Sequence, residues 1–363
     1  MTRVTMEGLV KRHDRATVID GVSLEIRAAE MMAALGPPGS GKTTLVRLVS
    51  GLDRLDDGEI YFDARMIHTL PPEERRVGLV FQDDALWPRH SVAENVEYPL
   101  RVRRVGRRDR RRRVGEILNL VGIDSLAGAG LEGLSDLQRR RVELARALAV
   151  EPELLILDEP SGRLGPHDQS EFRDGVRRVQ AETRVTTLVL VRDAREAMAW
   201  GDRLAVLDLG RIVQVGTPRE VYNHPTSTFV ARLLGATNLM QGKVDGNDSH
   251  GEVVVRTPLG RMIGHSSAAT PPEGAPVTVS IRPEALMLGP TVPIGSNRFA
   301  ATVERLVFRG EVREVYLQGP NDCPVVALTL QSQSHALREG QNLTVSVSPE
   351  LVVVLPEEFT VPN

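Results

Sequence analysis

Short apolar runs alternate with longer amphipathic stretches along the first two thirds of the chain. Compact runs of four or five apolar residues are typical of buried parallel strands, and a spacing of three to four residues is typical of helices. The runs predict strands at residues 31–35, 154–157, 187–191 and 204–207, and a helix from Lys42 to about Ser50. This alternation predicts an α/β domain with a largely parallel sheet.

The pattern changes twice along the chain. Residues 91–150 show helical spacing and few strand signals, which predicts a helical insertion at about 88–150. After Gly235, short β-prone runs are separated by Pro, Gly and Ser clusters, as in a small all-β barrel or sandwich. These runs lie at residues 253–255, 277–281, 325–330 and 343–347. We place the boundary near 236–242, which gives domains 1–238 and 239–363.

The composition is that of a soluble globular protein, with 41% hydrophobic and 26% charged residues among 363. A net charge of -3 provides no overall attraction to nucleic acid or membrane. Cys323 is the single cysteine, so an intramolecular disulfide is excluded. The N-terminus has no signal-peptide core, and no apolar run is long enough to span a bilayer. If the protein works at a membrane, other subunits must span it.

A glycine-rich segment between the strand at 31–35 and the following helix fits the spacing G-x-x-x-x-G-K-[ST]. Its backbone N–H groups can form a cradle for phosphate oxygens, and the helix directs its positive end at the same anion. The lysine would neutralise the β- and γ-phosphates of ATP, and the threonine hydroxyl would coordinate Mg²⁺. The expected nucleotide-binding residues are Gly36, Pro37, Pro38, Gly39, Ser40, Gly41, Lys42, Thr43 and Thr44.

Two carboxylates end the apolar run at 154–157. Asp158 would hold Mg²⁺ through its water shell, and Glu159 would orient or deprotonate the attacking water. The alternative interpretation is a strand that simply enters a polar loop, and the phosphate loop upstream favours the catalytic one.

With these two motifs, the chain resembles the ATPases of ATP-binding-cassette (ABC) transporters over most of residues 1–240. The resemblance implies that Gln82, in Phe81-Gln82-Asp83, senses Mg²⁺ and water. It implies that the segment around Trp87 contacts a permease, although a core position for Trp87 remains open. His13 takes the place of the aromatic residue that stacks on adenine in the family, and a surface histidine without a role is the alternative.

The segment Leu134-Ser135-Asp136-Leu137-Gln138 aligns with the family signature Leu-Ser-Gly-Gly-Gln, which caps the γ-phosphate bound to the opposite subunit. Ser135 and Gln138 are retained and form a capping-box pattern. Both glycines are replaced. At ~5 Å and an effective dielectric of ~20, the Asp136 carboxylate would repel the phosphate by roughly 3 kcal/mol unless it turns to solvent. Leu137 adds bulk where glycine permits close approach.

Two further positions depart from the family pattern. Residues 162–165 replace the usual dimer loop, and Arg192 occupies the position at which the family has its switch histidine. Arginine only donates hydrogen bonds and stays charged, so its role would be that of an arginine finger. Our hypothesis is that the chain binds Mg²⁺·ATP normally and hydrolyses it slowly as a homodimer; ordinary turnover is the alternative. A related ATPase subunit as partner would leave both nucleotide sites altered.

Residues 101–113 contain nine arginines. A solvated helix face is the interpretation that we favour; contact with acidic permease loops or anionic lipid headgroups, and contact with nucleic acid, are the alternatives. The 4% aromatic content argues against nucleic acid as a partner. The scattered histidines predict no structural metal site.

The C-terminal part also resembles a family domain. Thr237-Asn238-Leu239 and Ile281-Arg282-Pro283-Glu284 resemble segments of the OB-like domain of importer ATPases. The resemblance implies an importer of the polyamine, ferric-iron or sugar group, with the junction closer to polyamine, ferric-iron or related anion importers than to sugar importers. The implied partners are permease subunits, a second ATPase subunit and, indirectly, a solute-binding protein, at the cytoplasmic face of the membrane. The alternatives are a structural or regulatory subunit with little ATPase activity, and a soluble ABC protein of DNA repair or translation.

Overall fold

Six strands form the central sheet of the N-terminal unit, in the order β10-β9-β3-β8-β7-β6. All neighbours pair in parallel except β10 with β9. The strands are β3 (Met31–Leu35), β6 (Val77–Val80), β7 (Leu154–Asp158), β8 (Thr186–Val191), β9 (Arg203–Asp208) and β10 (Arg211–Gly216). Every residue of β3, β7 and β8 is buried, which explains why these strands read as continuous apolar runs.

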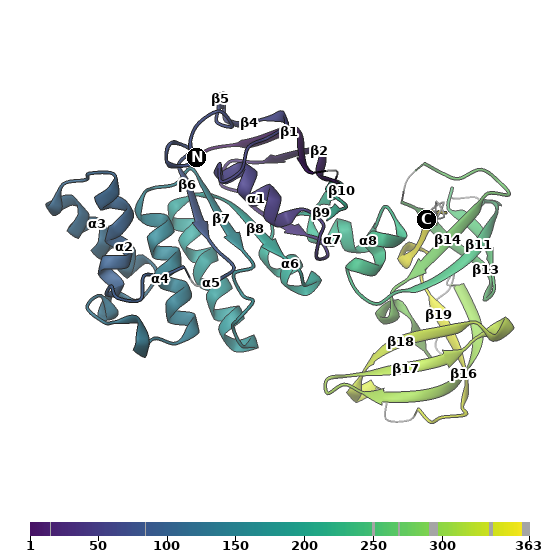
Figure 1. Ribbon diagram of the computed structural model, residues 1–363. Helices are drawn as coiled ribbons and strands as arrows, with labels where there is room; N and C mark the ends of the chain where they lie inside the picture. Colours follow the sequence, from purple (N-terminus) through teal and green to yellow (C-terminus); the bar gives the residue numbers. More distant parts are fainter. Residues whose placement is uncertain are drawn as a thin grey trace. The chain divides into compact units, whose positions relative to one another are not determined.

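The computed structural model describes residues 1–14, 16–83, 85–248, 251–267, 269–289, 297–333 and 337–357. They fall into two compact units, Met1–Pro218 and Arg219–Asn363. The predicted fold class is confirmed: the first unit is α/β and the second is built mainly of strands (Figure 1).

A second, antiparallel sheet of the N-terminal unit has the order β2-β1-β4-β5. Its strands are β1 (Val4–His13), β2 (Ala16–Ile26), β4 (Asp57–Phe62) and β5 (Arg65–Met66). Inward-facing residues of both sheets share one core with Leu45 and Leu48 of helix α1 (Lys42–Ser50). The helix that follows the phosphate loop is therefore fixed by apolar packing (Figure 1).

Three helices are inserted between β6 and β7, and two more complete the unit. They are α2 (Val92–Val102), α3 (Arg107–Leu120), α4 (Asp136–Ala149), α5 (Pro166–Thr183) and α6 (Ala194–Trp200). Short 3₁₀ turns lie at Pro72–Glu74, Asp124–Leu126 and Leu131–Gly133. None of the helices in the described ranges combines the length and the apolar character that crossing a membrane requires.

The C-terminal unit contains a closed barrel, β11-β12-β13-β20-β14, and a five-stranded sheet, β15-β19-β16-β17-β18. The barrel strands are β11 (Asn238–Asn247), β12 (Val253–Thr257), β13 (Gly260–Ser266), β14 (Pro276–Ile281) and β20 (Val352–Pro356). The sheet consists of β15 (Met287–Leu288), β16 (Asn297–Phe308), β17 (Val312–Gln318), β18 (Pro324–Leu330) and β19 (Asn342–Val347). Four 3₁₀ turns lie at Pro283–Ala285, Pro320–Asp322, Gln331–Gln333 and Pro349–Leu351. Barrel and sheet share one apolar core.

The compact units divide at Pro218 and Arg219, before the domain boundary at 238/239 that we expected from the sequence. Helices α7 (Pro218–Asn223) and α8 (Thr228–Leu233) belong to the C-terminal unit. The reason is Arg282, which is 8% exposed. Its guanidinium lies over the ring of Tyr222 and donates to backbone carbonyls of this helical segment, those of Tyr222, Ala231, Gly235 and Ala236.

Two fragments test this boundary. A fragment of residues 219–363 keeps the acceptors of Arg282, whereas one of residues 239–363 leaves a buried guanidinium without them. Since a buried unsatisfied polar group costs about 1–3 kcal/mol or more, we expect the shorter fragment to unfold at lower urea concentration, followed by circular dichroism. Equal midpoints would support the boundary at 238/239 instead.

Candidate functional site

The loop after β3 is shaped by two glycines that no other residue could replace without a clash. A Cβ atom at Gly36 would lie 2.5 Å from Ser40 Oγ and 2.6 Å from the carbonyl oxygen of Leu207. Gly41 has a φ of +100°, and a Cβ there would meet Val18 and Ile19 of β2. The chain is therefore held tightly against its surroundings just before α1 begins.

Lys42 is the first residue of α1, and its side chain folds back over the loop. Its ammonium donates to the carbonyl of Gly36 at 2.5 Å and of Pro37 at 3.0 Å, and lies 3.3 Å from Ser40 Oγ. The residue is 6% exposed, and burial lowers the pKa of the ammonium below its ordinary value. The lysine is thus fixed where the motif requires a cation.

The carboxylates at the end of β7 lie within electrostatic range of Lys42. Burial, reinforced by the charge of Glu159, raises the pKa of the Asp158 carboxyl, while Lys42 and Arg192 act in the opposite direction. Glu159 has a φ of +48°, a left-handed conformation that is uncommon outside glycine and typical of functional sites.

Arg192 forms an ion pair with Glu159 through its Nε atom. The arginine side chain is 51% exposed, whereas that of Glu159 is 13% exposed. The structure therefore brings four charged residues of the predicted site together: Lys42, Asp158, Glu159 and Arg192. The contact of Arg192 in this chain is the carboxylate expected to act on water.

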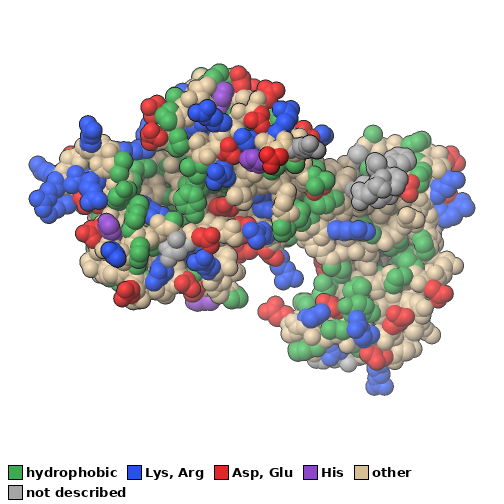
Figure 2. Space-filling model, in the orientation of Figure 1, with side chains coloured by type: hydrophobic (Ala, Val, Ile, Leu, Met, Phe, Trp, Pro, Cys, Tyr) green, Lys and Arg blue, Asp and Glu red, His purple; other side chains and the backbone are tan. Residues whose placement is uncertain are grey.

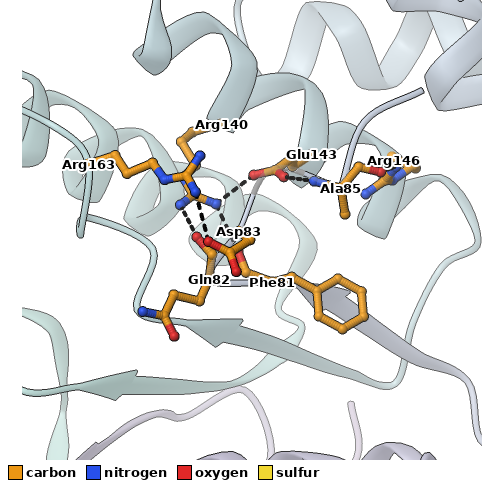
Figure 3. A network of polar contacts seen from close by, with 8 residues as sticks. All are labelled: Phe81, Gln82, Asp83, Ala85, Arg140, Glu143, Arg146 and Arg163. Carbon is orange, nitrogen blue, oxygen red and sulfur yellow. Dashed lines mark hydrogen bonds and ion pairs between the residues drawn. The ribbon is translucent and has the colours of Figure 1, made fainter. Parts of the chain in front are cut away.

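The segment that carries Gln82 is held by two buried charged residues of α4 (Figure 3). Arg140 donates to the carbonyl oxygens of Phe81 at 2.8 Å and Gln82 at 2.6 Å, and pairs with Glu143 at 2.7 Å. Glu143 in turn accepts from the backbone N–H of Ala85 at 3.1 Å. We call this arrangement the Arg140–Glu143 clamp. The side chain of Gln82 is exposed and points away from Arg140 (Figure 3).

Two more arginines hold the same segment from its other sides. Arg146 donates to the carbonyl of Ala85 at 2.6 Å. Arg163 lies in the segment 162–165, which replaces the family's usual dimer loop, and pairs with Asp83 at 2.7 Å. The glutamine segment is therefore connected both to the helix of the signature and to the loop after Glu159. Sequence reasoning missed these contacts; a signal for them was the opposite charges of Arg140 and Glu143, three residues apart on the predicted helix.

The predicted signature residues form a capping box at the start of α4. Ser135 Oγ accepts from the N–H of Gln138 at 3.2 Å, and Gln138 Oε1 accepts from the N–H of Ser135 at 2.9 Å. Asp136 is exposed. Leu137 is only 9% exposed, which corrects the expectation that it adds bulk to the approach face, because its side chain packs within its own subunit.

The remaining predicted residues lie around the phosphate loop. Thr43 is exposed and Thr44 half-buried in the first turn of α1, and neither Gly39 nor Pro38 is buried. His13 ends β1, with its side chain 52% exposed and its Nε2 3.8 Å from Asp53. Since β2 contacts the loop at Gly41, the adjoining end of β1 lies on the same side of the unit.

Comparisons with known proteins agree with this geometry. A family model described as "ABC transporter" matches residues 19–162, and one described as "TOBE domain" matches residues 279–355. The chain is 37% identical to an sn-glycerol-3-phosphate import ATP-binding protein of Rhizobium johnstonii, covering 91% of this chain and 88% of that protein. It is 36% identical to an Fe(3+) ions import ATP-binding protein of Streptomyces avermitilis, covering 97% and 98%.

Solved structures show the same similarity for the N-terminal unit. The cbiO1 protein of Clostridium perfringens, part of an ABC transporter complex, matches with a TM-score of 0.56 and 29% identity, covering 60% of this chain and 90% of that one. A dimeric ATP-binding cassette bound to ADP and phosphate matches with a TM-score of 0.53 and 28% identity, covering 60% and 99%.

The Arg140–Glu143 clamp yields a stability prediction. Glu143→Ala leaves the buried guanidinium of Arg140 without its carboxylate. We expect this change to lower the free energy of unfolding by about 3–5 kcal/mol. Both tryptophans, Trp87 and Trp200, lie in the N-terminal unit, so their fluorescence during urea unfolding reports on this unit alone.

Glu116→Ala is the matched control, because Glu116 pairs with Arg112 and Arg113 on the exposed surface of α3. Glu116→Ala is expected to lower the free energy of unfolding by about 1 kcal/mol or less. Equal losses in the two variants would contradict a structural role of the buried pair.

Proposed function

Because this chain belongs to the family of ATP-binding subunits of ABC transporters, we propose that its loop 36–43 binds Mg²⁺·ATP and that Glu159 activates the attacking water. The protein is an ABC-type ATPase and the ATP-binding subunit of an importer. The observation that carries the residue assignment is the convergence of Lys42, Asp158, Glu159 and Arg192. In the cycle that we propose, ATP joins two subunits and hydrolysis releases them, which drives a separate permease.

The loop fits a triphosphate. Its tight backbone is fixed by Gly36 and Gly41. The N–H groups of Gly39 and Gly41 can bind phosphate oxygens just before α1, whereas that of Ser40 donates to the carbonyl of Pro37 at 3.2 Å. Lys42 supplies the positive charge for the β- and γ-phosphates. His13, half-exposed on the same side of the unit, provides a ring on which adenine can stack.

The residues assigned to Mg²⁺ also fit that ion. Thr43, Gln82 and Asp158 offer hydroxyl, amide and carboxylate oxygens, the ligands that this hard cation prefers. When bound, Mg²⁺ neutralises the phosphate charge that develops during transfer. The buried, raised-pKa carboxyl of Asp158 gains a positive partner in such a complex.

Arg192 makes hydrolysis slow in this proposal. The guanidinium of Arg192 binds one carboxylate oxygen of Glu159 and competes there with the attacking water. Arginine can only donate, so it cannot exchange roles as the family's histidine does. Movement of Arg192 toward a γ-phosphate would release Glu159 and stabilise transition-state charge, which requires the ion pair to break first.

A second ATP-binding subunit, a copy of this chain or a relative, completes each site in this proposal. Ser135 accepts within the capping box, so its hydroxyl hydrogen remains available for a γ-phosphate oxygen of the opposite subunit. Gln138 lies one turn along the same helix start. The exposure of Asp136 lets its carboxylate turn to solvent rather than face the nucleotide.

We further propose a peripheral position at the cytoplasmic face of the membrane, with a solute-binding protein acting through the permease. The permease contact is assigned to the segment around Trp87. Its ring packs on Tyr98 at a centroid distance of 4.1 Å and under the guanidinium of Arg146 at 4.8 Å. Arg146 also donates to the carbonyl of Ala85, so it connects Trp87 to the segment that carries Gln82.

Lys42→Ala tests nucleotide binding. We expect ATP affinity, measured by equilibrium dialysis with Mg²⁺, to fall about 100-fold, because charge-assisted hydrogen bonds contribute about 1.5–3 kcal/mol each. Lys243→Ala, at an exposed lysine of the C-terminal unit, is the control and should bind as the unaltered chain does. Unchanged affinity of Lys42→Ala would remove the basis for the loop assignment.

Arg192→His tests the origin of slow turnover. Release of Glu159 should raise the ATPase rate about tenfold, which is less than the roughly 100- to 10,000-fold that a positioned general base supplies in full. Arg195→His, at an exposed arginine of α6, is the matched control, and Glu159→Gln should abolish the gain. A fast unaltered protein would overturn the proposal. ATP-dependent dimerisation with no turnover in either variant would favour a structural or regulatory subunit.

A further inference from the structure

Helix α3 presents an exposed arginine surface that the nucleotide site does not use. Arg107, Arg108 and Arg111 fall within an arc of about 100° on the helix, at 100° per residue. Arg104 lies just before the helix and is also exposed. We call these four residues the arginine stripe. Blue side chains gather over this end of the molecule in Figure 2.

The stripe differs from its neighbours in having no acidic partners. Arg110 pairs with Glu97 at 2.8 Å, Arg112 contacts Asp109 and Glu116, and Arg113 contacts Glu116 and Glu151. Among the described residues, no ion pair or hydrogen bond involves the guanidinium groups of the stripe. The four arginines of the stripe thus differ from Arg110, Arg112 and Arg113, each of which has at least one acidic partner.

We propose that the arginine stripe binds the headgroups of anionic phospholipids. The proposal rests on the proposed peripheral position at a membrane and uses none of the roles assigned in the nucleotide site. Helix α2, which starts near Trp87 and ends before Arg104, is about 16 Å long at 1.5 Å per residue. A subunit docked on a permease through the Trp87 segment therefore carries the stripe about one helix length from its membrane-embedded partner.

The composition of the stripe favours a lipid surface over a protein. The cores of protein interfaces are depleted of charged residues and rich in apolar ones. Among the described residues, Val102, at 63% exposure, is the one large exposed apolar residue between positions 101 and 120. A convex helix flank with unpaired guanidinium groups suits a fluid layer of phosphates, to which arginines are attracted without a matched shape. The segment 103–111 contains no aromatic side chain on which a nucleobase could stack.

The experiment is vesicle flotation of the full chain with phosphatidylcholine vesicles, with and without phosphatidylglycerol. The stripe variant is Arg104→Gln/Arg107→Gln/Arg108→Gln/Arg111→Gln. The control variant, with the same change in charge, is Arg219→Gln/Arg232→Gln/Arg261→Gln/Arg298→Gln, at exposed arginines of the C-terminal unit. Since each arginine near an anionic leaflet raises partitioning about fivefold, the loss of four should weaken binding of the stripe variant by about 600-fold. Binding of the control should fall much less, and added salt should weaken binding of the unaltered chain.

Three results would overturn the proposal: no binding of the unaltered chain to anionic vesicles, equal loss in both variants, or equal binding to vesicles without phosphatidylglycerol. Assembly with the permease in detergent is measured on the same variants. Loss of assembly in the stripe variant together with unchanged vesicle binding would assign the stripe to an acidic permease loop instead. ATP binding, measured in parallel, separates failure of the nucleotide site from failure of this proposal.

Discussion

The buried ion pair between Arg140 and Glu143 is the contact on which the geometry of the ATP-binding unit depends. Taking both charges out of water is costly, and their mutual attraction offsets this only when further hydrogen bonds satisfy the remaining groups. Here those groups are the backbone of Phe81, Gln82 and Ala85. The hydrogen bonds with these backbone groups therefore both stabilise the buried ion pair and fix the segment that carries Gln82 on α4. Because both members of the pair lie on α4, a displacement of this helix must carry Gln82 with it or break the hydrogen bonds to the backbone of Phe81, Gln82 and Ala85.

The charges of the nucleotide site balance in a way that separates binding from hydrolysis. Lys42 and Arg192 contribute two positive charges, and Asp158 and Glu159 two negative ones. A neutral histidine in place of Arg192 would leave this cluster negative, which is unfavourable for an incoming triphosphate. Arginine removes that repulsion and occupies Glu159 at the same time. In the function that we propose, this one substitution therefore favours binding and opposes turnover.

Much of the fold could be predicted from the sequence, because buried parallel strands are continuous apolar runs. The structure has strands at all four predicted positions of the central sheet and begins α1 at Lys42. The antiparallel sheet was not predicted, since β1 and β2 mix buried and exposed residues irregularly around bulges. The division between the compact units lies before the boundary that we predicted, and Arg282 binds the carbonyls of Tyr222 and Ala231 in the segment between the two positions, far from itself along the chain. Pairing of this kind leaves no local pattern.

The signature segment shows why the candidate site was only partly predictable. From the sequence, Asp136 and Leu137 were two obstacles of equal standing at the approach face. In the structure, the two residues differ in exposure. The carboxylate of Asp136 is exposed to water, and water and salt screen its repulsion of phosphate well below the roughly 3 kcal/mol expected for a fixed distance of ~5 Å. Leu137 turns inward and becomes part of the core. The departures expected to alter the chemistry most are therefore those with a fixed contact. Arg163 pairs with Asp83 and Arg192 with Glu159, and only the second contact involves the carboxylate proposed to act on water.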